Sequence, residues 1–168
     1  MGIHELRPGD TAQCLSCRER AVTLQNVKGK TFDLRDEDDL VFDEDLKLPV
    51  CGNCGEIYVR GAALRRFNGV LERLHAARKR EAIESFVAVI DREFADVPRQ
   101  SWEDMLGISH GYLSRLQKGT RNLSTPLEVL MRGVAQEPTQ ALRFIAHSRR
   151  LPGALAEYLG KHPRRSGG

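Results

Sequence analysis

Hydrophobic and polar residues follow one pattern before residue 61 and a different pattern after it. In residues 1–60 the apolar positions form short runs separated by glycines and charged residues, which is typical of strands joined by turns. We expect strands at residues 21–27, 46–50 and 56–60. From Gly61 onward apolar residues recur every three or four positions, which predicts helices that bury one face.

The helical part opens with two apolar stripes, the first formed by Leu64, Phe67, Leu71 and Leu74 and the second by Ile83, Phe86, Val87, Ile90 and Phe94. Neither Gly nor Pro occurs between Gly69 and Pro98. Residues 61–95 therefore form either one continuous helix or two helices with a hinge in the charged stretch 76–81. Three shorter helices are expected after this segment. The first has Thr125 as its N-cap, the second spans Pro138 to His147 and the third spans Ala154 to Leu159.

Residues 101–119 have the pattern of two short helices joined by a tight turn. Ser101 and Asp104 are spaced like a capping box, and Gly107 can adopt the left-handed conformation that ends a helix. Ser109 is a suitable N-cap for the second helix, which Gly119 then closes. Leu113 and Leu116 are three residues apart and should point inward together with Ile108.

All four cysteines of the chain lie in two CxxC pairs, Cys14/Cys17 and Cys51/Cys54. Each CxxC turn can direct two thiolates at one centre, and two such turns complete the tetrahedron that zinc prefers in structural sites. The alternatives are two disulfides or two redox pairs. A reducing cytosol disfavours the first, and the second would need a βαβ context that the pattern lacks. The spacing therefore predicts a structural Zn²⁺ bound by Cys14, Cys17, Cys51 and Cys54.

Charge is divided unevenly along the chain. Residues 1–60 hold 8 Lys/Arg and 12 Asp/Glu, a net charge of −4, whereas residues 61–168 hold 18 and 11, a net charge of +7. The second part is therefore the candidate for a polyanionic partner. The pattern contains no apolar run of membrane-spanning length and no secretion signal at its start, so we expect a cytoplasmic protein.

Eight acidic residues between Asp33 and Asp45 alternate with Leu34, Leu40, Val41 and Phe42. The simplest interpretation is a solvated acidic loop. The alternative is a docking surface for a basic protein, with apolar anchors and steering charges.

The second helix of residues 101–119 has the properties of a DNA-recognition helix, because its leucines face one side and compact polar residues face the other. Arg115 is the best candidate for reading bases, since its planar fork can form two hydrogen bonds with guanine. The remaining candidate DNA-binding residues are Ser109, His110, Gly111, Tyr112, Ser114, Lys118 and Arg121. The alternative is a helical bundle whose cationic side chains are merely solvated.

The Leu-Gly-Ile-Ser turn, the run Leu-Ser-Arg-Leu-Gln-Lys-Gly at 113–119 and the following Ser-Thr-Pro-Leu-Glu-Val-Leu resemble the Xre/Cro-type helix-turn-helix. With the two upstream CxxC pairs, the order is similar to that of MqsA-type (YgiT-like zinc finger) antitoxins. The resemblance implies a homodimer that binds a palindromic operator, and a zinc domain that holds a toxin. In that family an Asn and an Arg of the recognition helix read bases; Arg115 matches the Arg, whereas Gly111 stands in place of the Asn. Glu103 occupies a position where the family carries a small residue.

These patterns together predict an α+β protein with a small zinc-bound β-rich N-terminal domain and an all-α helix-turn-helix C-terminal domain. The expected boundaries are 1–60 for the zinc domain, 61–80 for a connecting helix or linker, 81–160 for the DNA-binding domain and 161–168 for a flexible tail. The predicted function is autoregulatory transcriptional repression as the antitoxin of a type II toxin–antitoxin system, with a basic toxin as partner. A stand-alone zinc-containing regulator and a protein–protein adaptor that uses the acidic domain are the alternatives. An enzyme is not expected, because the sequence shows no catalytic metal triad, activated nucleophile or phosphate-binding glycine loop.

Overall fold

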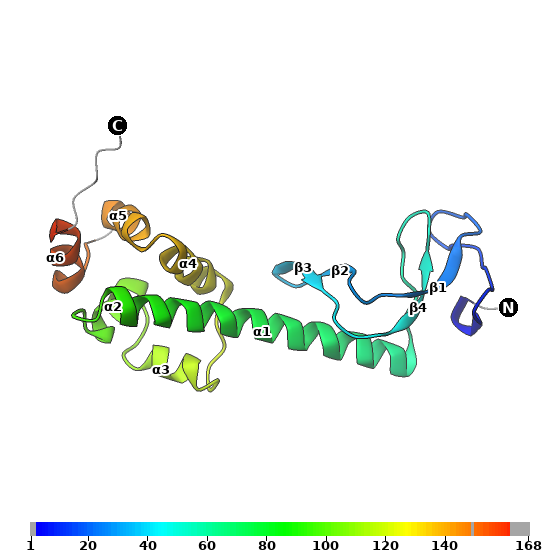
Figure 1. The fold of residues 1–168 in the computed structure, drawn as a ribbon, viewed down its shortest axis with the longest axis horizontal. Helices are drawn as coiled ribbons and strands as arrows, with labels where there is room; N and C mark the ends of the chain where they lie inside the picture. The colour runs from blue at the N-terminus through cyan, green and yellow to red at the C-terminus, as the bar shows by residue number, and fades with distance from the viewer. Residues whose placement is uncertain (1–2, 149, 162–168) are drawn as a thin grey trace. The chain divides into compact units, whose positions relative to one another are not determined.

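The computed structural model describes residues 3–148 and 150–161, and the chain divides into two compact units, Met1–Ala77 and Arg78–Gly168 (Figure 1). The boundary lies inside the segment 61–80 that the sequence marks as a connecting helix or linker. The predicted tail at 161–168 lies outside the described residues except for Lys161. Both helices and small antiparallel sheets are present, as the α+β class requires. Within the described residues, no helix combines the length and apolar character that a membrane span needs.

The first unit contains a short 3₁₀ helix, Ile3–Glu5, and two two-stranded antiparallel sheets. Strand β1 (Val22–Asn26) pairs with β4 (Lys47–Cys51), so that Val22 lies opposite Cys51. These strands confirm two of the three that the sequence predicts. The third prediction, a strand at 56–60, is wrong, because this segment forms only one bridge, from Ile57 to Val50.

The acidic segment is a β-hairpin and not a solvated loop. Strand β2 (Thr31–Leu34) pairs antiparallel with β3 (Glu37–Val41). The apolar residues between the acids explain the difference: Leu40 and Phe42 are buried, and Phe32 and Leu34 pack against the same cluster. The acidic side chains take the outward positions of strands whose inward positions build the core.

Helix α1 (Gly61–Glu93) is continuous over 33 residues, which resolves the choice between a hinge and one helix (Figure 1). Its first stripe belongs to the core of the first unit. There Phe67 stacks on Phe42 with ring centroids 5.2 Å apart and meets Phe32 edge-on at 5.0 Å. The second stripe, which includes Phe86 and Phe94, belongs to the core of the second unit.

In its described residues the second unit is built from helices only: the end of α1, then α2 (Arg99–Leu106), α3 (Tyr112–Gln117), α4 (Thr125–Gln136), α5 (Pro138–Ser148) and α6 (Gly153–Lys161). Trp102 lies at the centre of its core and is fully buried. Phe86 and Phe94 approach the indole edge-on, with centroids 5.7 and 4.9 Å away. Helices α5 and α6 confirm the two helices predicted near the end of the pattern.

Three predicted helix starts are shifted in the structure. Helix α2 begins after Pro98, whose extended backbone makes it the N-cap, so Ser101 lies in the first turn and forms no capping box. Helix α4 has Ser124 as N-cap, one residue before the predicted Thr125. Helix α3 begins at Tyr112 after a left-handed Gly111, so Ser109 is not its N-cap. The left-handed Gly107 that ends α2 and the left-handed Gly119 after α3 are confirmed.

Candidate functional site

The four cysteines gather at one point of the first unit. All four Sγ atoms lie within 4.8 Å of one another. The shortest separations join the two pairs, with 3.5 Å between Cys14 and Cys54 and 3.6 Å between Cys17 and Cys51. A tetrahedral ion with metal–sulfur bonds of about 2.3 Å places its sulfurs about 3.8 Å apart, close to these distances.

The two cysteine loops are held by backbone hydrogen bonds. In the first loop, the Cys14 N–H donates to the Glu19 carbonyl at 2.7 Å, and the Arg18 N–H donates to the Cys14 carbonyl at 3.2 Å. In the second loop, Cys51 ends β4, and the Gly52 N–H donates to the Ala21 carbonyl at 2.8 Å. The loop before β1 and the loop after β4 therefore each place two thiols at the same centre.

Tyr58 supports the cluster from outside the ligand set. Its hydroxyl accepts a hydrogen bond from the Leu15 N–H at 2.9 Å and donates to Cys14 Sγ at 3.1 Å. This hydrogen bond, with the Cys17 N–H, lowers the pKa of Cys14 to about 6 and so favours the thiolate that binds metals. The sequence reasoning missed Tyr58, whose only signal is an aromatic residue four positions after Cys54.

Cys54 differs from Cys14 in its electrostatics. A hydrogen bond from the Glu56 backbone acts to lower the pKa of Cys54, but burial and the three neighbouring thiols outweigh it and raise that pKa to about 12. Four thiols this close cannot all ionise without a cation among them. The donor set is therefore suited to one soft, tetrahedral metal ion.

The distances do not agree with disulfide bonds. A disulfide joins its sulfurs at about 2.05 Å, and the four described cysteines are free thiols. The structure thus shows a four-cysteine cluster able to hold a metal.

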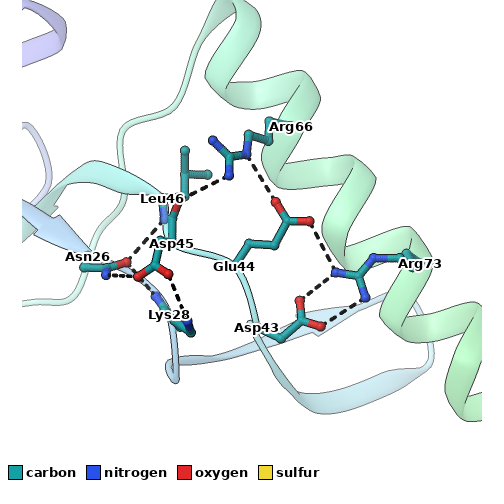
Figure 2. Close-up of polar contacts among 8 residues, drawn as sticks. All are labelled: Asn26, Lys28, Asp43, Glu44, Asp45, Leu46, Arg66 and Arg73. Atoms are coloured by element: carbon teal, nitrogen blue, oxygen red, sulfur yellow. Dashed lines mark hydrogen bonds and ion pairs between the residues drawn. The ribbon is translucent and has the colours of Figure 1, made fainter.

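The acidic hairpin and the segment after it form ion pairs within the first unit (Figure 2). Arg73 makes two hydrogen bonds with the Asp43 carboxylate, at 2.6 and 3.0 Å, and Arg66 bonds Glu44 at 3.2 Å. Lys28 bonds Asp45 at 2.9 Å. These contacts lower the pKa of Asp43 through Arg73 and that of Asp45 through Lys28. Asp43, Glu44 and Asp45 are therefore paired with cations of the same unit, of which Arg66 and Arg73 lie on α1 and Lys28 lies between β1 and β2.

His75 of α1 is a buried histidine. Only 7% of it is exposed, and its Nε2 lies 3.1 Å from Asp36 Oδ1. Asp36 lies in the hairpin turn at 35–36, and Arg35 in the same turn pairs with Glu72 of α1 at 2.6 Å. These two polar contacts join the hairpin turn to α1.

In the second unit, α3 has the sidedness predicted for it. Leu113 and Leu116 are buried and Ile108 packs against the same core. Of the candidate DNA-binding residues, five are exposed (Ser109, His110, Gly111, Lys118 and Arg121) and three are half-buried (Tyr112, Ser114 and Arg115). The structure thus places the eight residues on or beside one short helix.

Glu103 of α2 caps the beginning of α3. Its carboxylate is buried, with 3% of the residue exposed, and accepts hydrogen bonds from the Gly111 N–H at 2.8 Å and the Leu113 N–H at 2.9 Å. Since Gly111 has no side chain, no residue at the helix start itself provides a cap. A negative charge at this end also favours the helix dipole. In the sequence Glu103 stands out only as a departure from the family pattern, and its capping of α3 is not predicted.

Several candidate residues already have partners in the protein. His110 Nε2 lies 3.0 Å from Asp104 Oδ1, and the Tyr112 hydroxyl donates to the Asn122 carbonyl at 3.1 Å. Arg115 donates through Nη2 to Ser109 Oγ at 3.0 Å, with its guanidinium carbon 5.8 Å from the centre of the Tyr112 ring. Both the turn before α3 and the loop after it are therefore tied to α3 side chains.

Comparisons of the chain with protein-family models, with curated proteins and with solved structures gave no match.

Proposed function

We propose that the chain is a sequence-specific DNA-binding repressor whose α2–turn–α3 segment is a helix-turn-helix. The supporting observation is that Leu113, Leu116 and the Glu103 cap hold one side of α3. On the other side Tyr112, Ser114 and Arg115 are half-buried, and the flanking Ser109, His110 and Lys118 are exposed. A helix anchored in this way can enter a major groove with its polar side forward. Arg115, half-buried and not enclosed, reads a guanine in this proposal.

Zinc is the metal we propose for the cysteine cluster, with Cys14, Cys17, Cys51 and Cys54 as ligands. Four thiolates fill a tetrahedral ion completely, so no position remains for water or substrate, and the role is structural. Such an ion contributes folding free energy to the first unit when bound.

The proposed DNA complex is a homodimer on a palindromic operator in the cytoplasm. One helix of the length of α3, Tyr112–Gln117, reaches too few base pairs for useful specificity. Two copies of α3 spaced by about 34 Å would enter successive major grooves on one side of the duplex.

Within this proposal the chain acts as the antitoxin of a type II toxin–antitoxin system and represses its own operon. Support for this comes from the order of the two CxxC pairs and the helix-turn-helix, which is similar to MqsA-type antitoxins. Co-expression with the product of a neighbouring gene should then restore growth that this product alone stops. Without rescue, a stand-alone regulator is the better description. The adaptor alternative has less support, since Asp43, Glu44 and Asp45 are engaged inside their own unit.

The DNA-binding proposal is tested by a gel shift on the DNA upstream of the chain's own gene. We expect Arg115→Ala to reduce binding about 5- to 150-fold, the value of one bidentate guanine contact. Arg92→Ala is the matched control, because Arg92 is an exposed arginine of α1 paired only with its neighbour Glu93 among the contacts described. Equal binding by all three proteins would contradict α3 as the reading element.

A further inference from the structure

The guanidinium of Arg115 is folded back toward the start of its own helix. Besides the hydrogen bond from Nη2 to Ser109 Oγ at 3.0 Å, it approaches the Tyr112 ring to 5.8 Å. A long arginine side chain on a helix surface ordinarily samples many rotamers, and fixing it costs conformational entropy. The hydrogen bond to Ser109 and the ring contact favour one of those conformations before any ligand binds.

Gly111 lies beside the guanidinium of Arg115. A Cβ at position 111 would lie 3.4 Å from Arg115 Nη1, in van der Waals contact, and the backbone φ of +76° disfavours other residues. The Gly111 N–H is also bonded by Glu103. Gly111, which stands in place of the family's asparagine, thus lies in contact distance of the Arg115 guanidinium.

One nitrogen of the Arg115 guanidinium is closed to any ligand. Its Nε is buried and has no hydrogen-bond partner among the described residues. A guanidinium can present either Nε with one Nη or the two Nη atoms together to a planar acceptor pair. The edge that contains Nε is therefore closed to a ligand, and the edge formed by the two Nη atoms remains, with Nη2 already donating to Ser109.

We infer that Ser109 is a positioning residue for specificity: it holds Arg115 so that the two Nη atoms meet the O6 and N7 of a guanine. The inference rests on the DNA-binding function proposed above. Guanine presents two acceptors in the major groove, whereas adenine presents an acceptor and a donor. Both Nη groups are donors and therefore favour G·C over A·T, and in this inference the Ser109 hydroxyl fixes the guanidinium without touching that base.

The test uses a randomised duplex pool as probe, from which the full-length zinc-loaded protein selects its site. Affinities are then measured for the selected duplex and for versions in which each G·C pair is replaced by A·T. We expect Ser109→Ala to reduce discrimination about fivefold at the base pair that Arg115 reads, on the scale of one ordered side chain. Ser109→Thr keeps a hydroxyl and should restore most of it, while Ser85→Ala, an exposed serine of α1, should change nothing.

A mutant cycle separates positioning from direct contact. If Ser109 acts through Arg115, the effect of Ser109→Ala disappears in an Arg115→Ala background, and the affected base pair is the same in both single variants. If Ser109 contacts DNA itself, the effect persists there or moves to another base pair, and the inference is overturned. It is also overturned if Ser109→Ala discriminates like the unaltered protein while Arg115→Ala loses the guanine preference. If the unaltered protein selects no sequence at all, the proposed function fails first.

Discussion

The cysteine cluster of the first unit and the α2–α3 segment of the second depend on different ranges of the sequence. Each cysteine pair is set by a loop of a few residues, and the β1–β4 pairing brings the loops together. The start of α3 depends instead on a carboxylate from the neighbouring helix. Candidate metal ligands can thus be recognised from spacing, whereas the start of α3 is held by a buried hydrogen-bond acceptor from another helix.

The two units also differ in what holds them together. The core of the first unit is small and centres on Phe32, Phe42 and Phe67. The second has a larger cluster around the buried Trp102. A small core needs an additional staple, which is the part we propose for zinc.

Metal removal should produce the largest difference between the units. A structural zinc contributes on the order of 10 kcal/mol in apparent terms, so a strong chelator or Cys51→Ser should unfold the first unit. Amide NMR signals of residues 3–60 should collapse. The fluorescence of Trp102, the only tryptophan, should stay that of a buried indole. A parallel red shift of Trp102 would show that the two units do not respond separately.

Leu113→Ala tests whether the core holds α3 in place. Leu113 is 1% exposed, so its truncation should lower the free energy of unfolding of the second unit by about 2–5 kcal/mol. Urea unfolding followed by Trp102 fluorescence measures this. Val129→Ala, at a position 66% exposed, should change it by less than about 0.5 kcal/mol. Equal effects of the two variants would contradict the sidedness of the helix.

Glu103→Gln tests the cap. The Gly111 and Leu113 N–H groups bond to different oxygens of Glu103. In glutamine one of these oxygens becomes an NH2 group, which donates and does not accept, so one N–H loses its partner. The expected loss in unfolding free energy is about 1–3 kcal/mol, with the zinc content unchanged. Glu84→Gln, at an exposed position of α1, is the control. If both variants unfold at the same urea concentration, the carboxylate does not stabilise α3.

The smallest effect is expected from acid on the ion pairs of the first unit. Arg73 lowers the pKa of Asp43, so the stability from this pair is complete above the ordinary aspartate pKa of about 3.9 and is lost as the pH falls through the lowered value. At pH 6 the thermal midpoint of Asp43→Asn should therefore be slightly lower than that of the unaltered protein. At pH 3 the difference between the two midpoints should be smaller. Both proteins share the cysteine ligands, so acid release of metal affects them equally.

Local patterns in the sequence were sufficient for features that depend on neighbouring residues. The CxxC spacing identified the four residues that gather at one centre, and the spacing of Leu113 and Leu116 identified the buried side of α3. Gly107 was recognised as a helix end, since left-handed backbone favours glycine wherever it occurs. These features follow from the geometry of single turns and loops.

Only the tertiary structure decided features that depend on residues distant in the sequence. Most of the acidic stretch forms the β2–β3 hairpin, whose apolar residues share a cluster with residues of α1, and Asp43 and Glu44 after the hairpin pair with Arg73 and Arg66. His75 is buried beside Asp36 of the hairpin turn, and Glu103 supplies the cap at the start of α3. Composition marks such residues as charged, but burial and hydrogen bonding fix their roles, and both are properties of the folded chain.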